Sequence, residues 1–266
     1  MYLIASDLDG TLLNSHKKLS EDTKNYIKKI AKNNIFIIAT SRCYFDCLDI
    51  YNELELTTPI ICNSGAFIYS YNNDSLIRLR NSIDNDAFKD IFSHFKKDII
   101  NTIFHVNNDI YMYKLDSRYN FFFHIKEETQ FHELDFENAH FPQPISIHIF
   151  IKPEILEDFR VYIAKNHQNI NPIFIGADKT MAILELRLNQ STKGNALKKV
   201  IEYFNIDLEN TIAFGDGDVD LDMLYAVKKG FLMKNSFIND SILPKTEFDN
   251  DEDGVIKELQ KLLNKN

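Results

Sequence analysis

The sequence contains no tryptophan and only three cysteines, eight glycines and six prolines among 266 residues. Cys43, Cys47 and Cys62 are too few for a disulfide framework, so we expect reduced, structural thiols. With 44% hydrophobic and 26% charged residues, the composition excludes a collagen-like or largely disordered chain. No run of about 18 apolar residues is present, and the first residues do not resemble a signal peptide. We therefore expect a cytoplasmic protein that does not span a membrane.

The sequence also has fewer basic residues than acidic ones. The chain has 30 Lys and Arg against 39 Asp and Glu, which gives a formal net charge of −9. A surplus of cations is needed to neutralise the phosphates of a nucleic acid, so we expect no nucleic-acid partner. The length allows one large domain or two smaller ones, with ample apolar material for a core.

Both ends of the chain have an α/β rhythm. Short apolar runs at 2–6, 35–39 and 59–62 are typical of buried strands, and helix patterns separate them; Ser20 is the expected N-cap of the first helix. The same rhythm returns after Lys193. The expected elements there are a helix at 194–204, a strand at 211–214, a helix at 219–227, a strand at 230–233 and a helix at 255–263. Uninterrupted apolar strands alternating with helices predict a doubly wound, Rossmann-like parallel sheet covered on both faces.

The middle of the sequence follows a different pattern. Residues 145–149 alternate strictly between apolar and polar, as expected for a strand with one covered face. Residues 181–188 alternate similarly, which places Glu185 and Arg187 on the opposite side from Leu184 and Leu186. We therefore predict a core formed by 1–82 and 188–266, with an α/β domain inserted at 83–187.

The strongest local signal is Asp7-Leu8-Asp9-Gly10-Thr11-Leu12, directly after the first strand. Carboxylates two positions apart on an extended segment point the same way, at the strand end where open α/β sheets bind ligands. Close acidic groups repel each other unless a cation or a proton neutralises them, and hard oxygen ligands favour Mg²⁺. The alternatives are an acidic surface turn or a calcium loop. The EF-hand spacing fails, because Thr11 and Leu12 occupy positions that require an acidic residue and glycine.

A second acidic run, from Gly215 to Met223, also follows an apolar strand. Its calcium-loop interpretation fails as well, since Leu221 and Val227 stand where that loop needs Gly and Glu. Asp216 at the strand end is a candidate ligand for the same metal. At least Asp218 or Asp222 is expected to be a solvated charge at a helix N-terminus.

Two further segments fit a phosphate site. Ala39-Thr40-Ser41-Arg42 ends the second strand with hydroxyl donors, and Ser191-Thr192-Lys193-Gly194 begins a helix where free backbone N–H groups attract anions. Taken singly, a Lys or Thr at a helix start is more often a helix cap or a surface residue, and it is the order of the segments along the chain that makes the set specific.

Together these motifs resemble the haloacid dehalogenase superfamily. The resemblance rests on Asp7-x-Asp9-Gly10-Thr11, Thr40, Lys193 and Gly215-Asp216 with Asp220, in that order along the chain. Only 33 positions separate Asp7 from Thr40, whereas 153 separate Thr40 from Lys193. The insertion after the second motif resembles the cap of the Cof-type (class IIB) phosphatases. Asn235 and the Asp253-Gly254-Val255 segment resemble that family's C-terminal region.

The resemblance implies a role for each motif residue. Asp7 would be the nucleophile that forms an aspartyl-phosphate, and Asp9 the general acid and base. Mg²⁺ would be held by Asp7, the backbone carbonyl of Asp9 and Asp216, with Asp220 ordering the metal waters or Lys193. The phosphoryl group would be bound by Thr40, Ser41, Lys193 and Asn235.

We therefore predict an Mg²⁺-dependent phosphatase acting on small phosphorylated metabolites, such as a sugar phosphate or a cofactor phosphate. Two alternatives stay open: a sugar phosphotransferase or mutase with the same intermediate, and a regulatory protein that binds phosphate with little turnover. Val219 stands where the family usually has Asn. The oligomeric state is not indicated by the sequence.

The inserted segment also holds five of the eight histidines, His105, His124, His132, His140 and His148, without zinc-site spacing. We expect ordinary imidazoles there, with substrate contacts as the alternative. Residues 121–123, three consecutive phenylalanines, are expected to belong to the core of the inserted domain.

Overall fold

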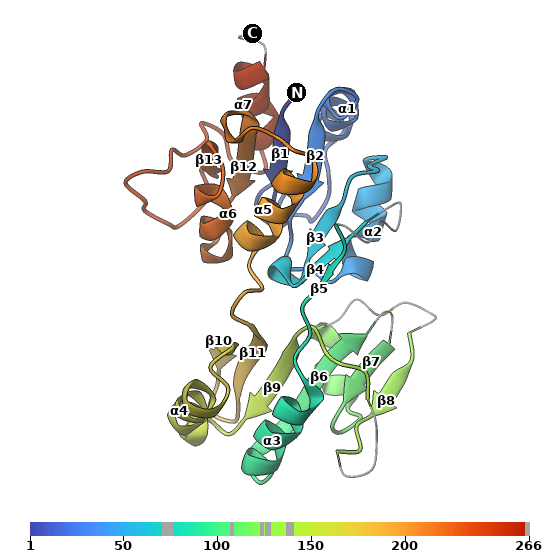
Figure 1. Cartoon of the computed structure of the whole chain (residues 1–266), viewed down its shortest axis with the longest axis vertical. Helices are drawn as coiled ribbons and strands as arrows, with labels where there is room; N and C mark the ends of the chain where they lie inside the picture. The colour runs from blue at the N-terminus through green and yellow to red at the C-terminus, as the bar shows by residue number, and fades with distance from the viewer. Residues whose placement is uncertain (71–76, 107–108, 123–124, 126–128, 137–140, 264–266) are drawn as a thin grey trace. The chain divides into compact units, whose positions relative to one another are not determined.

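The computed structural model describes residues 1–70, 77–106, 109–122, 125, 129–136 and 141–263. The chain forms two compact units (Figure 1). Unit 1 consists of Met1–Leu79 and Ser191–Asn266, and unit 2 is the intervening Arg80–Gln190. The boundaries expected from the sequence, 83 and 187, lie a few residues inside those of unit 2.

Unit 1 is built on a parallel sheet with the strand order β13-β12-β1-β2. A parallel bridge between Ala39 and Ile61 links its β2 edge to a smaller sheet, β3-β4-β5. The strands are β1 (Leu3–Ser6), β2 (Ile35–Ile38), β3 (Ile60–Cys62), β4 (Phe67–Tyr69), β5 (Leu79–Arg80), β12 (Thr211–Gly215) and β13 (Lys229–Leu232).

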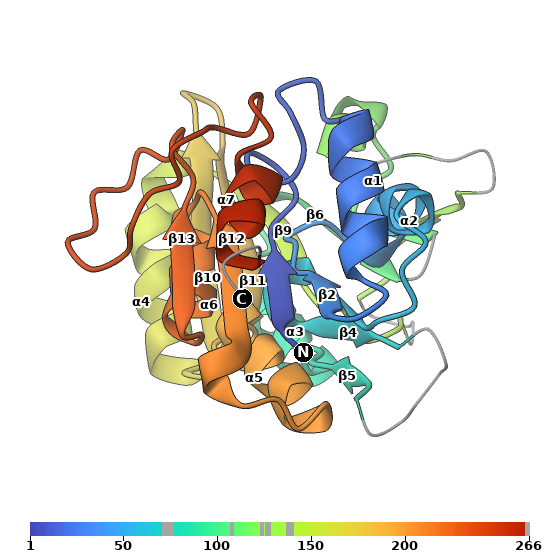
Figure 2. The same cartoon turned by 90° about the horizontal axis from the view of Figure 1, so that it is seen from above.

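Helices cover both faces of this sheet, which confirms the expected doubly wound α/β core. Ile4, Phe36 and Phe214 face one side, toward α1, α2 and α7. Leu3 and Ala213 face the other side, toward α5 and α6. Figure 2 shows the two groups of helices on opposite sides of the strands. The helices are α1 (Glu21–Ile30), α2 (Tyr44–Glu53), α5 (Lys193–Tyr203), α6 (Leu221–Tyr225) and α7 (Gly254–Leu263).

The helix ends follow local chemistry. The Ser20 side chain accepts a hydrogen bond from the Thr23 N–H and caps α1, as predicted. The helix predicted at 219–227 is wrong in its extent: a 3-10 turn at Asp218–Asp220 precedes a short α6. The acidic turn comes first because the Asp220 carboxylate folds back onto the N–H groups of Asp216 and Gly217.

Unit 2 contains a mainly antiparallel sheet with the order β10-β11-β9-β6-β7-β8. Its strands are β6 (Ile99–Val106), β7 (Asp109–Met112), β8 (Phe131–Glu133), β9 (Ile147–Ile151), β10 (Ile170–Ala177) and β11 (Ala182–Leu188). Helices α3 (Asn85–Phe95) and α4 (Leu156–Asn166) contribute Phe88, Phe92, Phe159 and Ile163 to a core on one face. Leu184 and Leu186 face this core, as the alternation predicted, so Glu185 and Arg187 face away from it.

The opposite face of that sheet carries a smaller apolar cluster. Ile103, Met112 and Phe150 pack there beneath Tyr119, which lies in the 3-10 segment Ser117–Phe122. His124, His140 and Phe123 lie outside the described residues. No helix among the described residues is long and apolar enough to cross a membrane. The three cysteines are free thiols, and the sulfur atoms of Cys47 and Cys62 lie 3.5 Å apart.

Candidate active site

The acidic motifs meet because their strands are parallel neighbours. Asp7 follows β1 and Asp216 follows β12, and Ser6 pairs with Phe214 in the register between the two strands. The Asp7 N–H donates to the Phe214 carbonyl at 3.0 Å and continues the pairing past the strand end. Both carboxylates therefore lie at the carboxyl edge of the sheet, the usual ligand-binding edge of open α/β folds.

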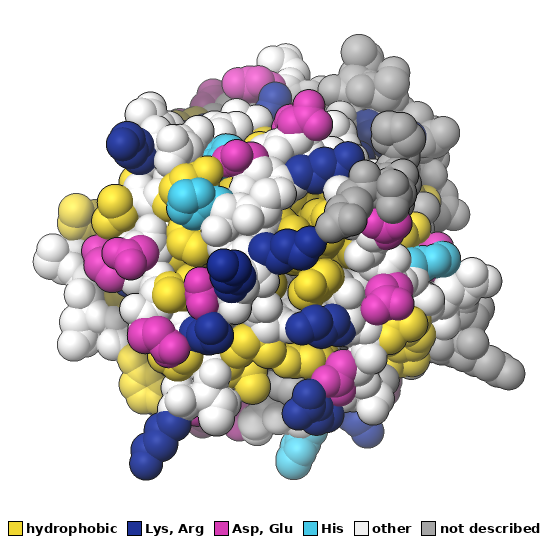
Figure 3. Space-filling model, turned by 90° about the horizontal axis from the view of Figure 1, so that it is seen from below, with side chains coloured by type: hydrophobic (Ala, Val, Ile, Leu, Met, Phe, Trp, Pro, Cys, Tyr) yellow, Lys and Arg dark blue, Asp and Glu magenta, His cyan; other side chains and the backbone are white. Residues whose placement is uncertain are grey.

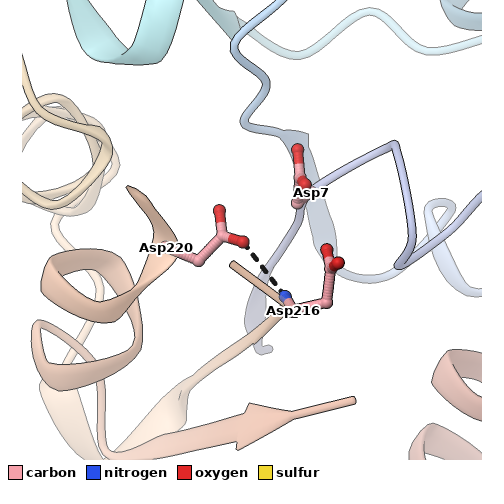
Figure 4. A group of neighbouring side chains, drawn as sticks. All are labelled: Asp7, Asp216 and Asp220. Carbon is pink, nitrogen blue, oxygen red and sulfur yellow. Dashed lines mark hydrogen bonds between the residues drawn. The ribbon is translucent and has the colours of Figure 1, made fainter. Parts of the chain in front are cut away.

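Three carboxylates form a compact group in unit 1 (Figure 4). Asp7, Asp216 and Asp220 each offer an oxygen, and these oxygens all lie within 4.8 Å of one another. Asp7 and Asp220 are buried, and Asp216 is half-buried. The donors are all hard oxygens, so the group fits Mg²⁺ better than zinc. Asp220, expected to order the metal waters or Lys193, lies close enough to belong to this group as well.

Lys193 neutralises two of these carboxylates. Its ammonium lies 2.8 Å from Oδ1 of Asp7 and 2.6 Å from Oδ1 of Asp220, and the residue is 1% exposed. Burial alone would lower the pKa of Lys193, but the charges of Asp7 and Asp220 raise it, so the lysine stays protonated. A fixed cation in a buried site is suited to bind a phosphoryl group.

Helix α5 is anchored so that Lys193 reaches this position. The Thr192 side chain caps the helix by accepting from the Asn195 N–H, and Asp222 accepts from the Gly194 N–H at 2.8 Å. The Asp222 side chain therefore links α6 to the start of α5 by a hydrogen bond and is not simply a solvated charge. A Cβ on Gly65 would lie 2.0 Å from the Thr192 carbonyl oxygen, and the residue has φ +93. Only glycine allows this close approach of the two backbones.

Burial and the crowding of like charges raise the pKa values of two carboxyl groups in this site. Burial raises the pKa of Asp7 to about 7, with a further contribution from Asp220 and opposition from Lys193. Burial also raises the pKa of Asp216, against a hydrogen bond from the Thr11 hydroxyl at 2.9 Å. One lysine does not offset three carboxylates, so this donor set favours a further cation.

The side chain of Asp9 points to a different set of partners. The Arg42 guanidinium donates one hydrogen bond to each of its carboxylate oxygens, both at 2.7 Å, and the Lys17 ammonium donates a third at 2.6 Å. Burial would raise the pKa of Asp9, but the hydrogen bonds from Arg42 and Lys17 lower it to about 2. Of the groups on Asp9, only the backbone carbonyl is left for the expected metal contact.

Sequence reasoning missed Arg42 and Lys17. A signal for Arg42 was present, because it ends the same segment as Thr40 and a cation there lies beside the carboxylates of the neighbouring strand. No sequence pattern indicated that Lys17 contacts Asp9; the residue lies in a loop and has φ 61.

Gly10 lets the first acidic loop close onto the second. It has φ +76, and a Cβ there would lie 2.4 Å from Oδ2 of Asp216. Its carbonyl accepts from the Asn235 side chain at 2.8 Å. Asn235, expected to bind phosphate, thus holds the Gly10 loop, while the Ser236 hydroxyl donates to the Asp216 carbonyl at 2.6 Å.

The remaining expected phosphate ligands lie at the end of β2. Thr40 is 1% exposed, and its hydroxyl accepts from the Arg42 N–H at 3.1 Å. The Ser41 hydroxyl is exposed and accepts from the Ser64 hydroxyl at 2.8 Å. Both follow β2, the strand next to β1, on the same sheet edge as Asp7. Their binding of phosphate stays a prediction.

Comparison with known proteins places this geometry in context. Residues 4–259 match the model of a family described as haloacid dehalogenase-like hydrolases. The chain is 30% identical to the 5-amino-6-(5-phospho-D-ribitylamino)uracil phosphatase YitU of Bacillus subtilis, over 97% of this chain and 96% of that protein. It is 32% identical to a putative phosphatase of Buchnera aphidicola from Acyrthosiphon pisum, over 99% and 97% of the two chains.

Solved structures share the fold. The crystal structure of TM0651 from Thermotoga maritima matches with a TM-score of 0.80 at 21% identity, over 98% of this chain and 97% of that one. A haloacid dehalogenase-like hydrolase from Bacteroides thetaiotaomicron matches with a TM-score of 0.78 at 22% identity, over 98% and 99%.

Proposed function

This chain belongs to the haloacid dehalogenase-like hydrolases, and we propose that it hydrolyses small phosphorylated metabolites with Mg²⁺ through an aspartyl-phosphate on Asp7. Its relatives make it a hydrolase of phosphate esters. The magnesium dependence, the intermediate and the substrate class are our proposal.

One observation carries the proposal: Lys193 is buried between Asp7 and Asp220 while Asp216 shares the same group. A nucleophilic carboxylate must approach a negatively charged phosphoryl group, which is unfavourable unless cations screen both. Lys193 supplies one fixed cation. Asp7 and Asp216, with the backbone carbonyl of Asp9, would hold a second cation, which would stabilise the charge on the phosphoryl oxygens.

The side chains then divide the reaction. Asp7 attacks phosphorus and the ester oxygen leaves, which transfers the phosphoryl group to the Asp7 carboxylate. Asp9 protonates the leaving oxygen and afterwards takes a proton from the water that hydrolyses the aspartyl-phosphate. Because the Arg42 pair keeps Asp9 ionised, Asp9 is ready as a base, and this pair must loosen before Asp9 can carry the proton that it donates.

Mg²⁺ would be held by Asp7, Asp216 and the backbone carbonyl of Asp9. Asp220 orients Lys193 and, through its other oxygen, fixes the backbone of Asp216 and Gly217. Thr40 and Ser41 would donate to the phosphoryl oxygens. Asn235, whose amide also holds the Gly10 loop, would bind the phosphoryl group with them.

We assign unit 2 the role of a cap domain that selects the substrate. Its place in the chain, between the segments that carry Thr40 and Lys193, supports this assignment. A relative at 30% identity is named for a substrate that joins a phosphorylated ribityl chain to a uracil ring. That name supports a cofactor-precursor or sugar phosphate as the substrate class here.

Partners and location complete the proposal. On the face drawn in Figure 3, basic side chains near the middle lie among acidic and apolar ones. Such mixing, with the net charge of −9, supports a small-molecule partner rather than a nucleic acid. The free cysteines support a cytoplasmic location.

The test uses the purified chain with p-nitrophenyl phosphate and a panel of sugar, nucleotide and cofactor phosphates. We expect hydrolysis that stops with EDTA, returns with Mg²⁺ and is poorly restored by Zn²⁺. Asp7→Asn should reduce turnover by at least a hundredfold, since an amide cannot attack phosphorus. Asp218→Asn, at an exposed acidic residue of the second motif, is the matched control and should retain activity.

Three results would contradict the proposal. Full activity after exhaustive chelation would exclude the metal. An Asp7→Asn variant within about tenfold of the parent, or roughly 1.4 kcal/mol of barrier, would exclude the nucleophile. Phosphate binding without turnover would indicate the regulatory alternative, and turnover that depends on a sugar bisphosphate would indicate the mutase.

A further inference from the structure

Unit 2 contains a cavity of about 460 Å³ beside the turn that joins β10 to β11. Tyr119, Phe150, Gly176, Met181 and Ile183 are among the residues that line it. Its volume lies in the usual range for small-molecule sites, about 300–1,000 Å³. None of these residues belongs to the acidic group of unit 1, so the proposed chemistry does not explain the cavity.

Gly176 is the unusual member of the lining. All eight glycines of the chain lie within the described residues, and for six of them an added Cβ would come within 3.0 Å of another atom. At Gly176 an added Cβ meets nothing within 4 Å, and φ is not positive. Glycine within a strand costs about 0.5–1 kcal/mol relative to alanine. Neither the backbone nor the packing requires glycine here, and its missing side chain leaves the space beside it open.

The sheet register shows where a side chain at Gly176 would go. Gly176 pairs with Ile183 across the hairpin, and Ile183 pairs with Phe150 on β9. Cross-strand partners share a face, so all three positions face away from the helices of unit 2. Any larger residue at 176 would fill the cavity beside Ile183.

The walls define the shape and chemistry of a ligand. Phe150 and Tyr119 meet edge to face with ring centroids 4.6 Å apart, and Met181 adds a polarisable thioether. Flat rings pack well against such surfaces. The Asp178 carboxylate accepts from the N–H groups of Thr180 and Met181, which orders the hairpin end that carries Met181.

The rim is polar and carries both signs of charge. The Arg118 guanidinium is exposed and paired with Asp116, and Asp178 lies on the rim as well. A purely hydrocarbon ligand would not use these groups. A ring with hydrogen-bond donors and acceptors on its edge would.

We propose that this cavity binds a planar nitrogen heterocycle, which lies over the packed rings of Tyr119 and Phe150 beside Met181 and leaves its polar edge at Arg118 and Asp178. The heterocycle is either part of the phosphate ester that the chain hydrolyses or a separate ligand. Only the first of these two sources rests on the proposed function.

Binding is measured without reference to activity. The full chain, labelled at its methionine methyl groups, contains five methionines, of which only Met181 lines this cavity. Adenine and lumichrome, two planar heterocycles without phosphate, serve as probes, and cyclohexanol is the non-planar control. We expect both heterocycles to shift the Met181 methyl resonance saturably by ring current, and cyclohexanol to shift it weakly or not at all.

Three variants locate the site. Gly176→Leu fills the cavity and should weaken heterocycle binding at least tenfold, with Gly176→Ala intermediate. Val161→Leu, at an exposed position of α4 outside the cavity, should bind as the parent does. Because an added Cβ at 176 meets no atom, Gly176→Ala should melt at or above the parent temperature, and a folded Gly176→Ala suffices if Gly176→Leu does not fold.

Two results would overturn the proposal. One is a Met181 resonance that neither heterocycle shifts saturably, or a shift that the filling variants leave unchanged. The other is an equal shift with cyclohexanol, which would make the cavity a general apolar one.

Hydrolysis then distinguishes the two sources of the ring. Uridine 5′-monophosphate and ribose 5-phosphate differ by one heterocycle. If the ring belongs to the substrate, Gly176→Leu raises KM for the nucleotide at least fivefold and leaves KM for ribose 5-phosphate unchanged. If the ring is a separate ligand, adenine changes the turnover of both esters to the same extent in the parent. In Gly176→Leu, adenine then changes the turnover of neither ester. If the parent chain hydrolyses neither ester, the proposed function is refuted. The binding measurement then decides by itself whether the cavity takes a heterocycle.

Discussion

Lys193 and Asp7 are 186 positions apart in the sequence, yet the Lys193 ammonium lies 2.8 Å from the Asp7 carboxylate. The whole of unit 2 is inserted between them. What brings them together is the sheet of unit 1, whose edge carries Asp7, and helix α5, which packs against that sheet and begins at Lys193.

Replacing Lys193 by Met should affect both stability and catalysis. Asp7 and Asp220 would be buried without their cation, and removal of one partner of a buried ion pair typically costs about 3–5 kcal/mol. Turnover should fall by at least a hundredfold, the loss expected for a fixed donor to the reacting group. Urea unfolding and p-nitrophenyl phosphate hydrolysis measure the two effects. Added Mg²⁺ should recover part of the stability and none of the turnover; parent-like stability without Mg²⁺ would show that Lys193 does not neutralise these carboxylates.

Arg42 and Lys17 bind the same carboxylate but should differ in importance. Arg42 makes two hydrogen bonds to Asp9 from a largely buried position, whereas the Lys17 side chain is 66% exposed. Exposed ion pairs contribute little. We expect Arg42→Ala to lower kcat/KM by about tenfold to a hundredfold, since Asp9 loses its bidentate partner, and Lys17→Ala to lower it less than threefold. The Mg²⁺ concentration for half-maximal rate should stay the same in both variants. Equal losses of kcat/KM in the two variants would mean that Asp9 needs only a positive charge nearby, and not the two hydrogen bonds that Arg42 makes.

The sheet and the acidic group could be predicted because both depend on simple periodicities. Alternation sends Leu3 and Ile4 to opposite faces, and parallel strands bring the residues after β1 and β12 to one edge. The contacts around Asp9 depend instead on loop conformations that no periodicity encodes. Lys17 adopts a positive φ, and Arg42 turns back from the end of β2 toward a residue 33 positions earlier.

At two residues the structure shows contacts that the sequence did not indicate. The Asn235 amide donates to the Gly10 carbonyl, a contact set by the chain path after β13, and its expected binding of phosphate stays a prediction. Asp222 was expected to be solvated if Asp218 was not, and it instead satisfies the Gly194 N–H. Local sequence identifies a polar residue near a strand or helix end, but its partner comes from a distant segment.

Two glycine-to-alanine substitutions should have opposite consequences. In Gly65→Ala the new methyl would lie 2.0 Å from the Thr192 carbonyl oxygen at a φ of +93, so either the loop or the start of α5 must move. We expect a loss of about 2 kcal/mol or more, with reduced turnover because Lys193 follows Thr192. Gly176→Ala places its methyl in open space and should be neutral or stabilising by up to about 1 kcal/mol. Thermal unfolding compares them, and similar losses in both would contradict this account of Gly65.

Unit 2 should lose stability in mild acid through His105. Burial lowers the pKa of His105 from 6.5 to about 4, with a smaller contribution from His148. The unfolded chain binds this proton below pH 6.5 and the folded chain does not, so the stabilisation is present at high pH and is lost as the pH falls from 6.5 toward 4. At pH 5 the cost is about 2 kcal/mol relative to pH 7.5. Urea unfolding of His105→Gln should show a smaller difference between these two pH values; an unchanged difference would place the acid sensitivity elsewhere.

The last prediction concerns Val219, at the position where the family resemblance leads us to expect Asn. The residue lies in the 3-10 turn between Asp218 and Asp220, and its side chain is 41% exposed. An amide there can therefore remain solvated, and Val219→Asn should leave the melting temperature unchanged. If the amide holds a water or a phosphoryl oxygen beside the acidic group, one hydrogen bond is worth about 0.5–1.5 kcal/mol, or up to about tenfold.

We expect this gain in Val219→Asn as a lower Mg²⁺ concentration for half-maximal hydrolysis of p-nitrophenyl phosphate, or as a higher turnover. Val219→Ala is the control, because it removes the apolar side chain without adding an amide. Equal Mg²⁺ dependence in the Asn and Ala variants would show that the amide finds no partner. A lower melting temperature together with weaker Mg²⁺ activation would show that the turn has repacked around valine, so that an amide at residue 219 no longer serves the site.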